Sequence, residues 1–113
     1  MKLVLLAALV AALAAPAAFA GSTTLTGTVG PGFTITLKNG SAKVTKLKAG
    51  AYTFKIADKS KIHNFHLVGP GVNKKTAVAF VGSVTWKVTL KKGTYKYMCD
   101  PHKAFMKGSF VVS

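Results

Sequence analysis

The chain has 113 residues, of which sixteen are lysine, none is arginine and only Asp58 and Asp100 are acidic, giving a formal net charge of +14. The length suits a single domain. The missing arginine and the lack of any recognisable binding motif argue against a nucleic-acid-binding protein. So basic a chain attracts acidic partners and anionic surfaces, although lysines also keep small domains soluble and protect sheet edges.

The first twenty residues have the pattern of an export signal. Lys2 precedes an apolar run over residues 3–15, and the small residues of Ala18-Phe19-Ala20 form a typical cleavage site. The run is short for a membrane span. We therefore expect a secretory signal peptide over residues 1–20 and an exported domain over 21–113, in the periplasm, at the cell envelope or outside the cell. An uncleaved N-terminal anchor is the alternative.

The rest of the chain has the pattern of strands. Apolar and polar residues alternate over residues 33–38, 52–57 and 84–90, which indicates half-buried antiparallel strands. Further strands are expected at Thr23–Val29, Ile62–Val68, Thr76–Phe80, Thr94–Cys99 and Ser109–Val112, while 42–48 could be strand or loop. Turn signals rich in Gly, Pro and Asn separate these segments. The pattern predicts an all-β fold, a β-sandwich of about seven to eight strands.

The most informative segment surrounds the only cysteine. An exported chain with one cysteine cannot form an internal disulfide. Three roles are then open to Cys99: it forms an intermolecular disulfide, it is a buried thiol, or it is a metal ligand. His102 follows it by three residues and Met106 by a further four, in a turn stiffened by Pro101. One loop thus offers a thiolate, an imidazole and a thioether, which together favour copper. Zinc is the alternative metal, although it gains little from a thioether.

A second imidazole must come from elsewhere in the chain. In the segment Ile62–Leu67, alternation places His63 on the core-facing side and Asn64 and His66 on the other. His63 is therefore preferred as the ligand over His66.

The His63-Asn64 pair, the element Tyr97-x-Cys99-x-Pro101-His102 and the later Met106 resemble the plastocyanin, pseudoazurin and amicyanin group of cupredoxins. The likeness covers the site and roughly the last half of the chain. It implies a Greek-key sandwich that binds one copper ion, with His63, Cys99 and His102 as equatorial ligands and Met106 as the axial one. It also implies that Asn64 ties the two ligand loops together and that its backbone forms a hydrogen bond with the Cys99 sulfur.

The resemblance implies a type 1 (blue) copper protein that cycles between Cu(I) and Cu(II) and transfers single electrons outside the cytoplasmic membrane. A copper carrier or storage protein using the same ligands is the alternative. An enzyme is not expected, because copper enzymes need additional metal centres and the chain has three histidines. We expect a monomer whose electrons pass through the edge of His102. Lys103 and Lys107 would favour acidic redox partners, and peripheral contact with an anionic envelope surface is also expected.

Overall fold

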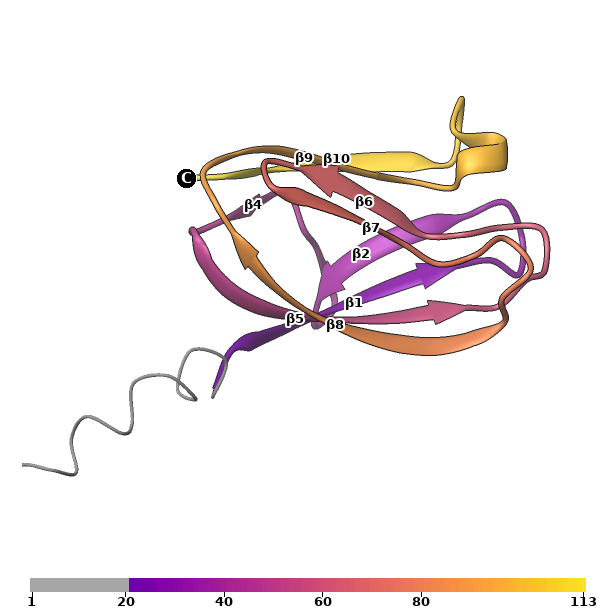
Figure 1. Ribbon diagram of the computed structural model, residues 1–113, viewed down its shortest axis with the longest axis horizontal. Coiled ribbons are helices and arrows are strands. Elements are labelled where there is room, and N and C mark those ends of the chain that lie inside the picture. The colour runs from indigo at the N-terminus through magenta and orange to yellow at the C-terminus, as the bar shows by residue number, and fades with distance from the viewer. Residues whose placement is uncertain (1–20) are drawn as a thin grey trace, which may run out of the picture.

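The structure is a computed structural model that describes residues 21–113, so the expected signal peptide lies outside the described residues. Two β-sheets pack face to face (Figure 1). Their strands are β1 (Thr23–Val29), β2 (Ile35–Asn39), β3 (Ala42–Lys43), β4 (Lys46–Leu47), β5 (Gly50–Asp58), β6 (His66–Gly69), β7 (Val72–Lys75), β8 (Gly82–Leu90), β9 (Gly93–Met98) and β10 (Lys107–Val112). A short 3-10 helix, η1, covers Asp100–His102. Within residues 21–113, no helix has the length and hydropathy needed to cross a membrane.

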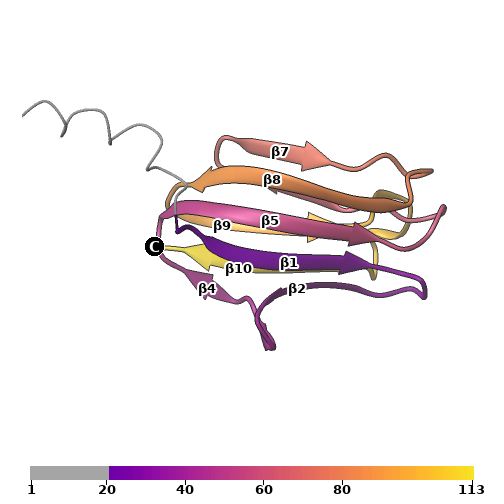
Figure 2. The same cartoon turned by 90° about the horizontal axis from the view of Figure 1, so that it is seen from below.

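The first sheet has the strand order β3-β2-β1-β5-β8, and Figure 2 shows β2, β1, β5 and β8 side by side. The second sheet has the order β4-β10-β9-β6-β7. The pairs β1–β5 and β4–β10 are parallel, and the other pairs are antiparallel. Neighbours in a sheet are therefore often distant in sequence, as expected of a Greek-key sandwich.

Alternating side chains and turn-forming residues explain these strands. In β9, Tyr95 and Tyr97 face the core while Lys96 is exposed, which is the period-two pattern of a sheet with one wet face. Between β6 and β7, Pro70-Gly71 forms the hairpin loop, and Gly71 has φ +71°. Proline followed by glycine at positive φ is typical of a type II turn. The loop thereby fixes the register of this hairpin.

The inner faces of both sheets supply the core. Its largest buried side chains are aromatic, and they come mainly from β5, β9, β10 and the segment before β6. Tyr97 stacks on Phe65 with ring centroids 5.5 Å apart, and Tyr95 stacks on Phe110 at 5.3 Å. Aromatic side chains stabilise a core because each buries a large apolar area and because offset or edge-to-face ring pairs attract each other. The Tyr97–Phe65 stack joins the segment leading to Cys99 with the segment that carries His63.

The sandwich is confirmed, but several expected elements are different. There are ten strands rather than seven or eight, because the ambiguous segment 42–48 supplies two strands of two residues each, and the sheets are mixed rather than antiparallel. No strand forms over Thr76–Phe80. The strand in this part of the chain is β7, Val72–Lys75, which ends before Thr76 because it begins directly after the Pro70-Gly71 turn. The strand expected from Ile62 begins only at His66, since residues 63–65 follow an irregular path.

The topology brings the two candidate ligand segments to the same end of the sandwich. His63 lies in the loop between β5 and β6, and Cys99 and His102 lie between β9 and β10. Strands β6 and β9 are hydrogen-bonded neighbours, with His66 opposite Met98. Both loops therefore emerge side by side, at the right of Figure 1.

Candidate metal centre

Cys99 follows directly after β9 and continues its alternation. Tyr95, Tyr97 and Cys99 are all at most 1% exposed, and Met98 between them is half-buried on the outer side. The Cys99 N–H donates to the carbonyl of Met106 at 3.0 Å. This bond closes the loop at its base, so the thiol is held at the inner edge of the sheet.

The loop between Cys99 and Met106 is a compact turn. Pro101 lies within η1, where its fixed φ suits the first helical positions. The His102 N–H donates to the carbonyl of Cys99 at 3.0 Å, and the Met106 N–H donates to the carbonyl of His102 at 2.8 Å. These bonds fold the loop back, so that the imidazole of His102 lies over the thiol.

His63 reaches the same place from the other loop and is fully buried. The backbone passes close to its ring at Gly30, where an added Cβ would lie 3.2 Å from the His63 Cδ2. Gly30 also has φ +74°, a conformation that glycine adopts at little cost. The turn after β1 therefore covers one side of the His63 imidazole and limits its movement.

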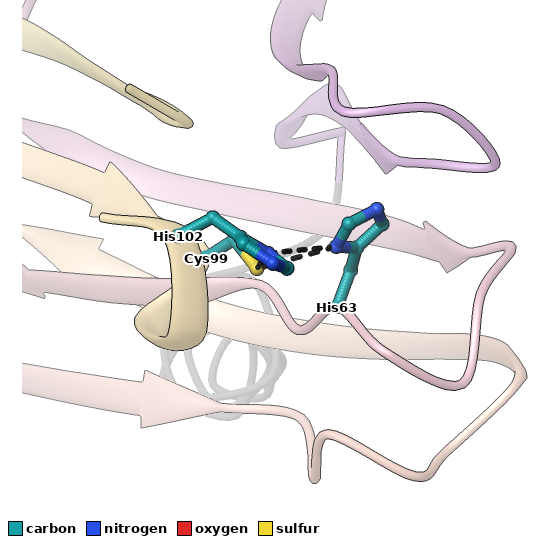
Figure 3. A group of neighbouring side chains, drawn as sticks. All are labelled: His63, Cys99 and His102. Carbon is teal, nitrogen blue, oxygen red and sulfur yellow. Dashed lines mark hydrogen bonds between the residues drawn. The ribbon is translucent and has the colours of Figure 1, made fainter. Parts of the chain in front are cut away.

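Figure 3 shows the imidazole of His63 facing the side chains of Cys99 and His102. The donor atoms of the three residues form a nearly equilateral triangle. The two Nδ1 atoms are 3.2 Å apart, and the Cys99 Sγ lies 3.6 Å from the Nδ1 of His63 and 3.5 Å from that of His102. A point equidistant from all three atoms would be about 2.0 Å from each, which is the length of a metal–nitrogen bond and slightly less than that of a metal–sulfur bond. The three side chains thus fit one small metal ion.

The chemistry of the donor set favours copper over other metals. Two imidazoles and a thiolate in a trigonal arrangement are typical of blue-copper sites, which add a weak axial sulfur. Met106 is buried and lies in the same loop, so its thioether is the candidate for that position. His66 is outside the triangle, because its two ring nitrogens contact Asp100 and Asn73.

A hydrogen-bonded network outside the triangle connects the two loops. The Asn64 Oδ1 accepts the Asp100 N–H at 2.7 Å, and its Nδ2 donates to the Asp100 carboxylate at 2.9 Å and to the carbonyl of Thr76 at 3.1 Å. His66 Nδ1 lies 2.8 Å from the other oxygen of that carboxylate. Asn64 therefore links the loops through its side chain. The expected bond from its backbone to the Cys99 sulfur is absent within residues 21–113.

The two acidic side chains, Asp58 and Asp100, have opposite pKa shifts. Burial raises the pKa of Asp58, more than the hydrogen bonds from Ser60 and Thr76 lower it. Burial also acts on Asp100, but the hydrogen bonds of His66 and Asn64, with the nearby charges of His66 and Lys75, bring its pKa below the usual value. Asp100 is thus held as a carboxylate beside the candidate metal loop.

Aromatic rings surround the accessible side of the site. Phe33 is 58% exposed and Phe105 is 62% exposed, and both rings lie against His102, with centroids 5.0 and 5.7 Å away. Phe33 also contacts His63 edge to face at 5.2 Å. The Nε2 of His63 is buried and has no hydrogen-bond partner among the described residues. His102 is half-buried, so its ring is the more accessible of the two imidazoles.

A family model for a cupredoxin-like domain matches residues 3–112. The chain belongs to the cupredoxin-like family. Solved structures of rusticyanin share the fold: a reduced form is 20% identical with a TM-score of 0.57, covering 80% of this chain and 78% of that one. Rusticyanin from Thiobacillus ferrooxidans is 21% identical with a TM-score of 0.54, covering 80% and 76%. An NMR structure of reduced rusticyanin is 21% identical with a TM-score of 0.56, covering 84% of each chain. No curated protein matches the chain.

Two residues of this cupredoxin site were not expected from the sequence. Phe33 belonged to a strand pattern, but the structure places it before β2, in the turn beside the imidazoles. Thr76 was assigned to a strand, but its hydroxyl accepts the Phe65 N–H at 2.9 Å and lies 3.4 Å from the Asp58 carboxylate. The sequence Gly30-Pro31-Gly32 is a turn signal that could have placed the adjacent Phe33 in a loop, whereas no local pattern identifies Thr76.

Proposed function

We propose that this cupredoxin is a type 1 copper protein that carries single electrons outside the cytoplasmic membrane. The observation that carries the proposal is the triangle of His63, Cys99 and His102, whose donor atoms lie 3.2–3.6 Å apart around a position suited to one ion. Copper bound there would supply the Cu(II)/Cu(I) couple. Met106 is proposed as the axial ligand.

The residues around the triangle support electron transfer because burial and hydrogen bonds hold the donor side chains in place. His63 and Cys99 are completely buried, the Cys99–Met106 bond closes one loop, and Asn64 links that loop to the other. A donor set that moves little when the metal changes oxidation state keeps the reorganisation energy of electron transfer small. Trigonal imidazole–thiolate sites accept both Cu(I) and Cu(II). The scaffold therefore favours rapid exchange of an electron over release of the metal.

The proposed route for the electron is the edge of His102. This ring is half-buried, whereas His63 is covered, and the exposed rings of Phe33 and Phe105 offer an apolar contact surface around it. Lys103 lies in the same loop and Lys107 directly follows it, and both are exposed. Their positive charges favour acidic redox partners. We propose a monomeric carrier rather than an enzyme, since the third histidine, His66, is engaged by Asp100 and Asn73. The apolar N-terminal pattern supports export, and with it a location in the periplasm, cell envelope or medium.

The test is to add Cu(II) to the purified protein and record its visible absorption. An intense visible band, as expected for a copper–thiolate bond, should appear in the wild type and be lost in Cys99→Ser. The matched control is His66→Gln, which lies outside the triangle and should keep the band. Cyclic voltammetry should then give a reversible one-electron wave.

Other outcomes would contradict the proposal in different ways. A colourless protein that binds copper tightly and yields it quickly to a chelator would indicate a copper carrier. A protein that binds no copper would remove the ligand assignment altogether. Retention of the band in Cys99→Ser would show that the thiolate is not a ligand.

A further inference from the structure

A groove lies on the outer side of the second sheet, next to the loop that carries His102. Its volume is about 630 Å³, and its lining includes Lys43, Lys96, Met98, Lys103, Lys107 and Ser109. Lys96 and Met98 point outward from β9 because Tyr97, which lies between them, faces the core, and Ser109 lies opposite Lys96 on β10. Lys43 comes from β3 of the other sheet.

The positive charge of this groove is not neutralised by the protein. The chain has only two acidic residues; Asp58 is 2% exposed, and Asp100 pairs with His66. All four groove lysines are exposed, and none of them forms an ion pair within residues 21–113. Ammonium groups gathered around a depression concentrate positive potential there and attract an anionic ligand.

The shape and lining of the groove favour one kind of anion. No aromatic ring lines it, so the bases of a single-stranded nucleic acid would have no stacking platform. Its lysines come from both sheets and surround a hollow, whereas a lipid bilayer presents a broad surface that needs no hollow. A volume of about 630 Å³ is large enough for several side chains of an extended peptide.

We propose that this lysine groove is a docking site for an acidic peptide segment, rich in Asp or Glu, of the redox partner. The identity of the partner as a redox protein rests on the proposed function; the binding of an acidic segment does not. Lys103 and Lys107 extend the groove to the ligand loop, so a segment bound there would hold its protein beside His102 and Phe105. The groove thus provides an anchor separate from the apolar contact at the ring edge.

The test uses a hexaglutamate peptide and ¹⁵N NMR of the purified protein at low ionic strength, with and without Cu(I). On addition of the peptide, the largest changes in amide chemical shift should occur at Lys43, Lys96, Met98 and Ser109. These changes should become smaller as the salt concentration is raised, because screening weakens the attraction between charges. The double variant Lys43→Glu/Lys96→Glu should bind the peptide about tenfold more weakly or worse. The matched control, Lys55→Glu/Lys92→Glu, has the same net charge, alters exposed lysines outside the groove and should lose less than about twofold.

Equal losses in the two double variants, or shifts spread over the whole surface, would overturn the proposal in favour of a net-charge effect. Binding to vesicles of anionic phospholipid through Lys43 and Lys96, without binding to hexaglutamate, would overturn it in favour of a membrane surface. Because Lys43 and Lys96 are not candidate ligands, the copper band measures the proposed function independently. A normal band with no peptide binding would therefore contradict only the groove.

Discussion

The side chain of Asn64 and the backbone of Asp100 form the shortest link between the two loops of the candidate metal centre, with the Asp100 N–H 2.7 Å from the Asn64 Oδ1. Asn64 directly follows His63, and Asp100 directly follows Cys99. The bond therefore sets the distance between the peptide units that hold the buried imidazole and the thiol. A small change at Asn64 should affect both donors.

Replacing Asn64 by alanine should destabilise the fold. Asn64 is 1% exposed, and its removal leaves the Asp100 N–H, the Asp100 carboxylate and the Thr76 carbonyl without this partner. The Asp100 carboxylate is 36% exposed and keeps His66 as a partner, so the main cost comes from the other two groups. Buried polar groups that lose their partners cost about 1–3 kcal/mol each, so a loss of about 2–6 kcal/mol is expected. Urea unfolding of the metal-free protein, followed by the fluorescence of Trp86, measures it.

The control for this prediction is Asn39→Ala, at the exposed end of β2. It should change the free energy of unfolding by no more than about 0.5 kcal/mol. If Asn64→Ala unfolded at the same urea concentration as the control, the link between the loops would not contribute to stability.

Met106 should control the reduction potential more than the stability of the fold. Met106→Leu conserves volume in a buried position, so we expect a cost below about 1.5 kcal/mol. If its thioether is the axial donor, leucine should raise the potential, because loss of a donor destabilises Cu(II) more than Cu(I). Met106→Gln should lower it, because an oxygen donor favours Cu(II). Voltammetry of both variants measures the shifts, and identical potentials in wild type and both variants would exclude axial ligation.

The sequence was most informative where the chemistry is local. Cys99, His102 and Met106 lie within eight residues, and the alternation of Tyr95, Tyr97 and Cys99 in the sequence puts these three side chains on one face, which the structure shows to be buried. The sandwich could likewise be predicted, because alternation and turn residues recur along the whole domain.

Contacts between distant segments could not be predicted in the same way. Asn64 was placed on the outer side with His66, yet it is buried because Asp100 and Thr76, 36 and 12 residues away, satisfy its amide. The parallel pairing of β1 with β5 also depends on how the two sheets assemble rather than on either strand alone. Alternation reports which face of a strand is apolar, but it carries no information about the partner strand.

Asp58 should make the folded state less stable as the pH rises through the acidic range. Burial raises its pKa from the usual 3.8, so the folded state holds this proton more tightly than the unfolded chain does. The stabilising contribution of protonated Asp58 is therefore complete below about pH 3.8 and is lost as the pH rises through the folded pKa. Asp58→Asn should lack this dependence.

The measurement is urea unfolding of wild type and Asp58→Asn over a series of pH values, without metal. The difference between the two free energies of unfolding isolates Asp58, because the opposite contribution of Asp100, whose pKa is lowered, is common to both proteins. The advantage of wild type over the variant should shrink as the pH increases above about 3.8. A difference that stayed constant or grew would contradict the proposed role of burial.

Gly108 should tolerate no side chain, because it lies opposite Tyr97 in the pairing of β10 with β9. An added Cβ would overlap the Tyr97 ring, which is itself held by its stack on Phe65. Forcing extra volume into a packed site costs about 1–3 kcal/mol, so Gly108→Ala should lower the free energy of unfolding by that amount. Gly32→Ala, where the added Cβ meets no atom within 4 Å, is the control and should be nearly neutral. If both alanine variants unfolded at the same urea concentration, the Tyr97 ring would have room to move, and the packing that joins the two ligand segments would be looser than the structure indicates.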